Sequence, residues 1–168
     1  MTQILFFYFA GVIVITSFLV IALRNPVYSA LSLLIMFFHV AGLYVLLNAE
    51  FIAVIQIIVY AGAILVLYLF VVMLLNIKRE ERYQHQFLIG LFVGLLILTE
   101  LLLILTRSVF SESLGQYTVE RINTLGSTQA VGQALYTVYL FPFEVASFIL
   151  LVAMIGAIVL AKRGIIEK

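Results

Sequence analysis

Polar side chains that interrupt long apolar stretches are the residues of this sequence that could do chemistry. Seven of them stand out, His39, Glu50, Gln56, Tyr60, Tyr68, Glu100 and Glu144, and all but Tyr60 are candidates for a polar path. Ionisable side chains at membrane depth are rare, and they commonly mark proton paths, bound ions or contacts with neighbouring helices. Each of the seven also has a simpler structural explanation.

A single histidine is a poor metal or haem ligand because it has no second ligand beside it. His39 lies in the middle of an apolar segment, and the only other histidine, His85, is expected at the membrane edge. The simpler interpretation of His39 is a neutral imidazole that hydrogen-bonds to a neighbouring helix. No metal site is therefore expected.

The carboxylates have explanations that depend on position. Glu100 precedes Arg107 by two helical turns, about 10 Å of rise, and a long arginine side chain could partly reach back. Glu100 is expected near lipid headgroups or a partner subunit, with a proton-relay role as the alternative. Glu50 and Glu144 are expected at helix N-termini, where unpaired N–H groups and the helix dipole stabilise a carboxylate. Gln56 and Tyr60 share one helix face and suit interhelical hydrogen bonds.

Composition places these residues in a membrane protein. Of 168 residues, 65% are hydrophobic and 10% are charged, with a net charge of +1. This balance does not fit a soluble domain or a nucleic-acid partner. The chain has no cysteine, which excludes disulfides, thiol chemistry and cysteine-ligated iron–sulfur clusters. No nucleotide-binding glycine motif occurs.

The apolar segments predict an all-α protein with five transmembrane helices in one integral membrane domain, residues 1–168. The helices are expected at about residues 4–23, 27–47, 51–76, 87–106 and 139–161. Pro26 suits the first turn of the second helix. Residues 107–132 are expected to form a solvated loop, and residues 133–141 an interfacial turn. The N-terminal segment is expected to be a first helix and not a signal peptide.

Basic residues predict the orientation, with the N-terminus outside and the C-terminus in the cytoplasm. One side of the membrane would hold seven of the nine basic residues: Arg24, Lys78, Arg79, Arg82, Lys162, Arg163 and Lys168. The other side would hold only Arg107 and Arg121.

The third helix is the most unusual segment. It would rise about 37 Å, more than the ~30 Å apolar core of a bilayer, so it must tilt, protrude or distort. Ala61, Gly62 and Ala63 follow Tyr60 near its centre and permit a close backbone approach. Because few ionisable groups converge at mid-depth, the chain is interpreted as a subunit of a larger assembly.

Three stretches resemble a known family: QIIVYAGAILVLYLFVVMLLN at 56–76, RNPVYSALSLLIMF at 24–37 and PFEVASFILLVAMIGAIVLAKR at 142–163. They are similar to subunit J of the proton-pumping NADH:quinone oxidoreductases, respiratory complex I, whose mitochondrial counterpart is NADH dehydrogenase subunit 6. The similarity covers essentially the whole chain and is most specific over Val59–Met73.

The resemblance implies a π-bulge in the third helix, with Tyr60, Ala61, Gly62, Ala63 and Val66 as gating residues. Returning the bulge to regular α-helix would rotate the residues beyond it by roughly 100°. In the family this rotation is proposed to gate a hydrated path between the quinone site and the glutamates of a small adjacent subunit. Some relatives carry Glu at the position of Gln56, where this chain has a neutral amide.

The resemblance also implies that this chain has no active site, catalytic residue or cofactor of its own. FMN, iron–sulfur clusters and quinone would belong to partner subunits, and the chain would lie in the bacterial inner membrane. Two alternatives remain. One is a subunit of a related ferredoxin-, hydrogenase- or antiporter-type complex, and the other is an independent small transporter or scaffold.

Overall fold

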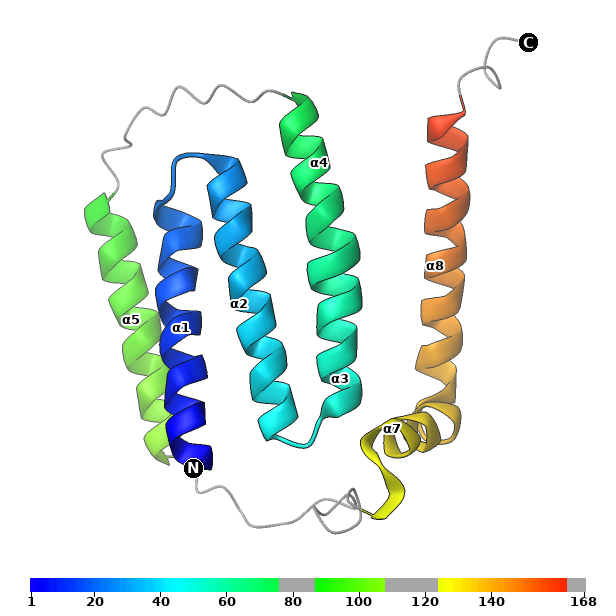
Figure 1. Cartoon of the computed structure of the whole chain (residues 1–168), viewed down its shortest axis with the longest axis horizontal. Coiled ribbons are helices and arrows are strands. Elements are labelled where there is room, and N and C mark those ends of the chain that lie inside the picture. The colour runs from blue at the N-terminus through cyan, green and yellow to red at the C-terminus, as the bar shows by residue number, and fades with distance from the viewer. Residues whose placement is uncertain (76–86, 108–123, 163–168) are drawn as a thin grey trace.

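The computed structural model describes residues 1–75, 87–107 and 124–162, and these residues are almost entirely helical (Figure 1). The helices are α1 (Thr2–Ala22), α2 (Pro26–Leu46), α3 (Glu50–Ile55), η1 (Gln56–Ile64), α4 (Leu65–Leu75), α5 (Phe87–Arg107), α7 (Ser127–Tyr136) and α8 (Leu140–Ala161). Five spans are long and apolar enough to cross a membrane, one of them formed by α3, η1 and α4 together. The prediction of an all-α membrane protein with five spans is confirmed.

The turn between α1 and α2 is built by local polar groups. Asn25 caps α2, and its side-chain oxygen accepts a hydrogen bond from the Val27 N–H at 2.9 Å. Pro26 occupies the first helical position, where its missing N–H leaves no bond unmade. The Ser29 hydroxyl donates to the Val20 carbonyl at 2.6 Å and fastens the two helix ends together.

The turn between α2 and α3 depends on a left-handed residue. Asn48 has a φ of 56°, and asparagine tolerates this region better than most residues. The Ala49 N–H donates to the Tyr44 carbonyl at 2.9 Å, and the Asn48 N–H donates to the Val45 carbonyl at 3.1 Å. This pair of bonds is the Schellman arrangement, which satisfies the last carbonyls of α2.

Small side chains let α2 pack closely against both of its neighbours, α1 and the third span. Ala30 and Ala41 are buried on α2, and Thr16 is buried on α1. The Thr16 hydroxyl donates to the Val12 carbonyl in its own helix, so its burial leaves no unpaired donor. A Cβ atom on Gly42 would lie 2.6 Å from the Phe9 ring, so any side chain there would force the ring to move.

The amphipathic helix α7 lies in a region where the sequence predicts a loop and a turn. The loop prediction is wrong for residues 127–132, because they belong to α7. The Phe51 N–H, free at the start of α3, donates to the Ser127 hydroxyl oxygen at 3.3 Å and ties α7 to the third span. This bond links residues 76 positions apart, which local composition cannot reveal.

The last two spans receive little cover from the rest of the chain. Among the described residues α5 approaches no other helix closely, and α8 approaches only α7. Figure 1 shows α8 apart from the row formed by α1, α2 and the third span. Several predictions concern residues outside the described ranges: the basic run Lys78–Arg82, His85, Arg121, Arg163, Lys168 and the side chain of Arg107.

Candidate functional site: the π-helical centre of the third span

The third span is one continuous helix with a π-helical centre. α-Helical turns at Glu50–Ile55 and Leu65–Leu75 flank nine π-helical residues, Gln56–Ile64. The Leu65 N–H donates to the carbonyl of Tyr60, five residues earlier, instead of to the residue four earlier. A π-helical segment is present where a bulge was expected, and such segments commonly mark functional sites.

Burial along this span reveals the inserted residue. In this span, which packs against α2, Ala53 and Gln56 are buried up to the first residue of the π segment, and Ala61, Leu65 and Val72 are buried after its first turn. In a regular helix Gln56 and Ala61 would lie about 140° apart at 100° per residue. Here both are covered, so the wider turn shifts the buried face by one residue.

The predicted gating residues occupy different sides of the span. Ala61 is 3% exposed and faces the packed interior, whereas Val66 is 58% exposed. Gly62 and Ala63 are exposed as well. The Tyr60 ring contacts the ring of Phe37 on α2 edge-on, with centroids 5.9 Å apart.

Gly62 is fitted to the π geometry. A Cβ atom built there would lie 3.3 Å from the carbonyl oxygen of Ile57, five residues back in the same helix. This distance is shorter than an ordinary carbon–oxygen contact, so a side chain would press on the backbone of the wide turn.

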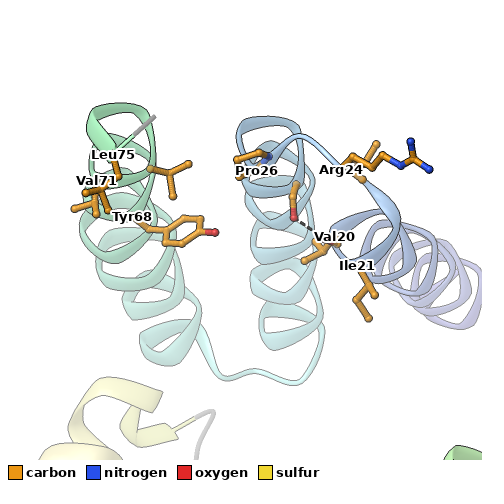
Figure 2. A pocket seen from close by; sticks show the side chains of 10 residues that line it. Val20, Ile21, Arg24, Pro26, Tyr68, Val71 and Leu75 are labelled. Carbon is orange, nitrogen blue, oxygen red and sulfur yellow. Dashed lines mark hydrogen bonds between the residues drawn. The ribbon is translucent and has the colours of Figure 1, made fainter. Parts of the chain in front are cut away.

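Two adjoining hollows lie between α4 and the α1–α2 pair. The outer one, ≈ 500 Å³, lies beside Arg24 and Pro26, and the inner one, ≈ 240 Å³, extends to Phe37 and Ile64. Both hollows are lined by Val20, Ser29 and Tyr68. Figure 2 shows the Tyr68 ring extending from α4 toward α2, while the Arg24 guanidinium points away from Tyr68.

The structure brings some of the polar candidates to the third span and leaves others apart. Gln56 is 92% covered at the first turn of η1, and Glu50 lies in the first turn of α3. His39 lies on the α1–α2 seam, where its Nδ1–H donates to the Ile35 carbonyl at 2.7 Å. Its ring packs against Tyr8 and Phe9, with centroids 5.8 and 5.9 Å away.

Glu100 and Glu144 are both exposed, on α5 and α8 respectively. The expectation that Glu144 caps a helix is wrong, because α8 begins at Leu140 and the carboxylate lies beyond the first turn. Pro142 occupies that first turn, where its lack of an N–H is tolerated. Among the described residues, neither α5 nor α8 contacts the third span, so neither glutamate lies at this site.

Phe37 is a site residue that the sequence interpretation did not identify. A signal for it existed: α2 and the third span run antiparallel, and Phe37 and Tyr60 lie nine or ten residues from the turn that joins them. Matching depth across such a hairpin would have paired them. In the described part of the chain no three metal-ligating side chains come together.

The family model for NADH-ubiquinone/plastoquinone oxidoreductase chain 6 matches residues 16–160. The chain belongs to this family. NADH-ubiquinone oxidoreductase chain 6 of Marchantia polymorpha is 41% identical over 96% of this chain and 87% of its own length. NADH-quinone oxidoreductase subunit J of Rickettsia bellii is 36% identical over 95% of this chain and 80% of its own length. The chain 6 protein of Cyanidium caldarium is 39% identical over 94% and 82%. Membership of the complex I subunit J/chain 6 family, expected from the sequence, is confirmed.

Proposed function

We propose that this chain 6 family member is a membrane-arm subunit that couples quinone reduction to proton translocation by a change of helical register at η1. It does no redox chemistry of its own. FMN, iron–sulfur clusters and quinone would be held by other subunits of the complex. The shift of the buried face between Gln56 and Ala61 is the observation that carries the proposal.

The register shift has a defined consequence. If the inserted residue were absorbed into regular α-helix, every residue beyond it would turn by roughly 100°. Tyr60, Ile64 and Val71 would then replace Ala61, Leu65 and Val72 on the face that packs against α2. The small Ala61 would give way to a tyrosine ring, so the two registers differ in bulk at the centre of the membrane.

The inner hollow supplies room for such a change. It is lined by Ile64, Leu65 and Tyr68 from the third span and by Phe37 from α2. The three side chains from the third span are the ones that a rotation would move, so the rotation would fill or open the hollow. We propose that Glu50, Gln56 and Tyr68 line the polar path that opens with it, and that His39, Glu100 and Glu144 lie outside it.

The surroundings follow from the same proposal. The partners would be the subunit that holds the quinone site and the small subunit that carries intramembrane glutamates. In a bacterial host the chain would cross the plasma membrane with its C-terminus in the cytoplasm. A reporter fused to the C-terminus and found outside the cell would contradict that orientation.

One test biases the register through Gly62. Gly62→Ala places a Cβ against the Ile57 carbonyl in the π form, whereas a regular α-helix accepts alanine readily. The variant should lower the number of protons translocated per NADH oxidised and leave NADH oxidation by ferricyanide intact. Gly11→Ala on α1, where a Cβ meets nothing within 4 Å, is the matched control. Normal pumping in an assembled Gly62→Ala complex would reject the gate.

A second test follows the rotation directly. Ala53 and Ala61 are each 3% exposed, one before the inserted residue and one after it, and the chain has no natural cysteine. Ala61→Cys should be protected from a small thiol reagent at rest and become modified during turnover. Ala53→Cys should stay protected throughout. Equal behaviour of the two cysteines would contradict a rotation confined to the residues beyond the bulge.

A further inference from the structure

One face of α5 carries a single carboxylate among apolar side chains. Phe92, Leu95, Leu96, Thr99, Glu100 and Leu103 line a shallow hollow of ≈ 530 Å³ on this helix. We call this set the Glu100 face. Their spacing of three and four residues makes a single stripe along the helix. The Thr99 hydroxyl donates to the Leu95 carbonyl at 2.8 Å, which leaves Glu100 as the polar group that needs a partner.

Glu100 lies at membrane depth. It follows Phe87 by thirteen positions and precedes the end of α5 by seven, so it lies about 20 Å from one end and about 10 Å from the other. Helical side chains lean toward the N-terminus of their helix, which carries this carboxylate further from the nearer end. Lipid tails offer no hydrogen-bond donor there, so an ionised carboxylate requires a protein partner.

The described basic side chains of this chain do not meet that need. Arg24 lies in the α1–α2 turn and Lys162 follows α8. Figure 1 shows both of these points on the side of the bundle where α5 begins. They are therefore separated from Glu100 by most of the 20 Å that the helix rises from that side, which is beyond the reach of a side chain.

We propose that the Glu100 face packs against a transmembrane helix of another subunit, and that this helix places a lysine or arginine side chain at the depth of Glu100. Opposite charges attract strongly where the dielectric constant is low, so the attraction would offset the desolvation penalty of both groups. The pair would fix both the depth and the rotation of α5. This inference rests on the chain's being one subunit of a membrane complex, and it does not depend on the gate at η1.

The first experiment maps the face in the assembled complex. A photo-crosslinking amino acid replaces Leu103, on the Glu100 face, or Leu101, which lies on the opposite side at nearly the same depth. Both leucines are 52% exposed, so they are matched in access. We expect an adduct with one membrane subunit from position 103 and several times less of it from position 101. Equal yields at the two positions, or adducts with lipid alone, would overturn the proposal.

The second experiment tests the charge. Glu100→Gln should reduce the yield of intact complex after detergent extraction, and Glu100→Lys should reduce it further. Replacing the basic residue of the crosslinked helix by glutamate should restore the yield of the Glu100→Lys complex. Two results would overturn the proposal: an Arg107→Gln variant that alone reproduces the loss without an intersubunit adduct, or a Glu100→Gln complex that assembles normally but pumps fewer protons. The first would assign the pair to this chain, and the second would make Glu100 a proton carrier.

Discussion

The ring of Tyr60 stands edge-on against the ring of Phe37, with centroids 5.9 Å apart and planes inclined by 71°. One residue belongs to the π-helical segment and the other to the regular helix α2. The contact therefore holds the wide turn against an element that has no such distortion. It gives the π register a specific side-chain contact whose geometry a rotated third span would have to change.

Loss of either ring should weaken this register. An edge-to-face aromatic pair contributes about 0.5–1.5 kcal/mol beyond its burial. Phe37→Leu and Tyr60→Leu should each lower the temperature at which the purified complex loses this subunit. The double variant should lower this temperature by less than the sum of the two single decreases. Tyr60→Phe keeps the ring and should behave as the natural protein does, and strict additivity would mean that the rings do not stabilise each other.

A side chain at Gly42 should destabilise the α1–α2 seam. A Cβ atom there would lie 2.6 Å from the Phe9 ring, which also packs on His39. Gly42→Ala should cost about 1–3 kcal/mol through overpacking of the α1–α2 seam. The loss can be measured as the reduced temperature of subunit release. A Phe9→Leu change in the same chain should recover part of it. A Gly42→Ala variant as stable as the natural protein would show that the α1–α2 seam repacks without cost.

Substitutions of Asn48 should show whether the turn depends on its backbone conformation or on its side chain. Its φ of 56° is left-handed, a region that disfavours side chains with a Cβ by about 1–2 kcal/mol. Asn48→Gly should therefore leave the stability of the complex nearly unchanged, whereas Asn48→Ala should lower it by about 1 kcal/mol. Equal losses for the two variants would point to a hydrogen bond of the asparagine side chain instead.

Replacing Ser127 should loosen α7 more than replacing its neighbour Thr128. Its hydroxyl oxygen accepts from the Phe51 N–H at the start of α3, and a typical net hydrogen bond contributes about 0.5–1.5 kcal/mol. Ser127→Ala should loosen α7 and raise its susceptibility to limited proteolysis in the intact complex. Thr128→Ala, on the exposed side of the same helix, is the control, and equal cleavage of both variants would argue against the tether.

The sequence predicts those features that depend on local chemistry. Uninterrupted apolar length identifies the five spans, and Asn25 with Pro26 identifies the start of α2. α7 was not predicted because its serine, threonine and glutamine content resembles a loop, and its anchor on Phe51 comes from a distant part of the chain. Glu144 was assigned to a helix start one turn too late because Pro142 suggested the wrong first turn.

The candidate site was predictable in place but not in geometry. Ala61 and Gly62 mark the region of close approach, and the family resemblance implies the bulge. Hydrophobic periodicity could not locate the inserted residue, because a span that is apolar on every side has no visible face. Only the burial of Gln56 and Ala61 against the same neighbour fixes where the face shifts. The role of Phe37 likewise depends on which helix lies opposite.

The unequal cover of the five spans bears on how the protein is made. The described part of the chain buries no residue in the membrane-spanning parts of α5 and α8, whereas α1, α2 and the third span shelter one another. The first three helices can settle into a hairpin-like unit as soon as they leave the ribosome and enter the bilayer. The last two gain their packing only when sister subunits arrive, so copies synthesised in excess should be left with orphan helices and should be cleared by membrane quality-control proteases.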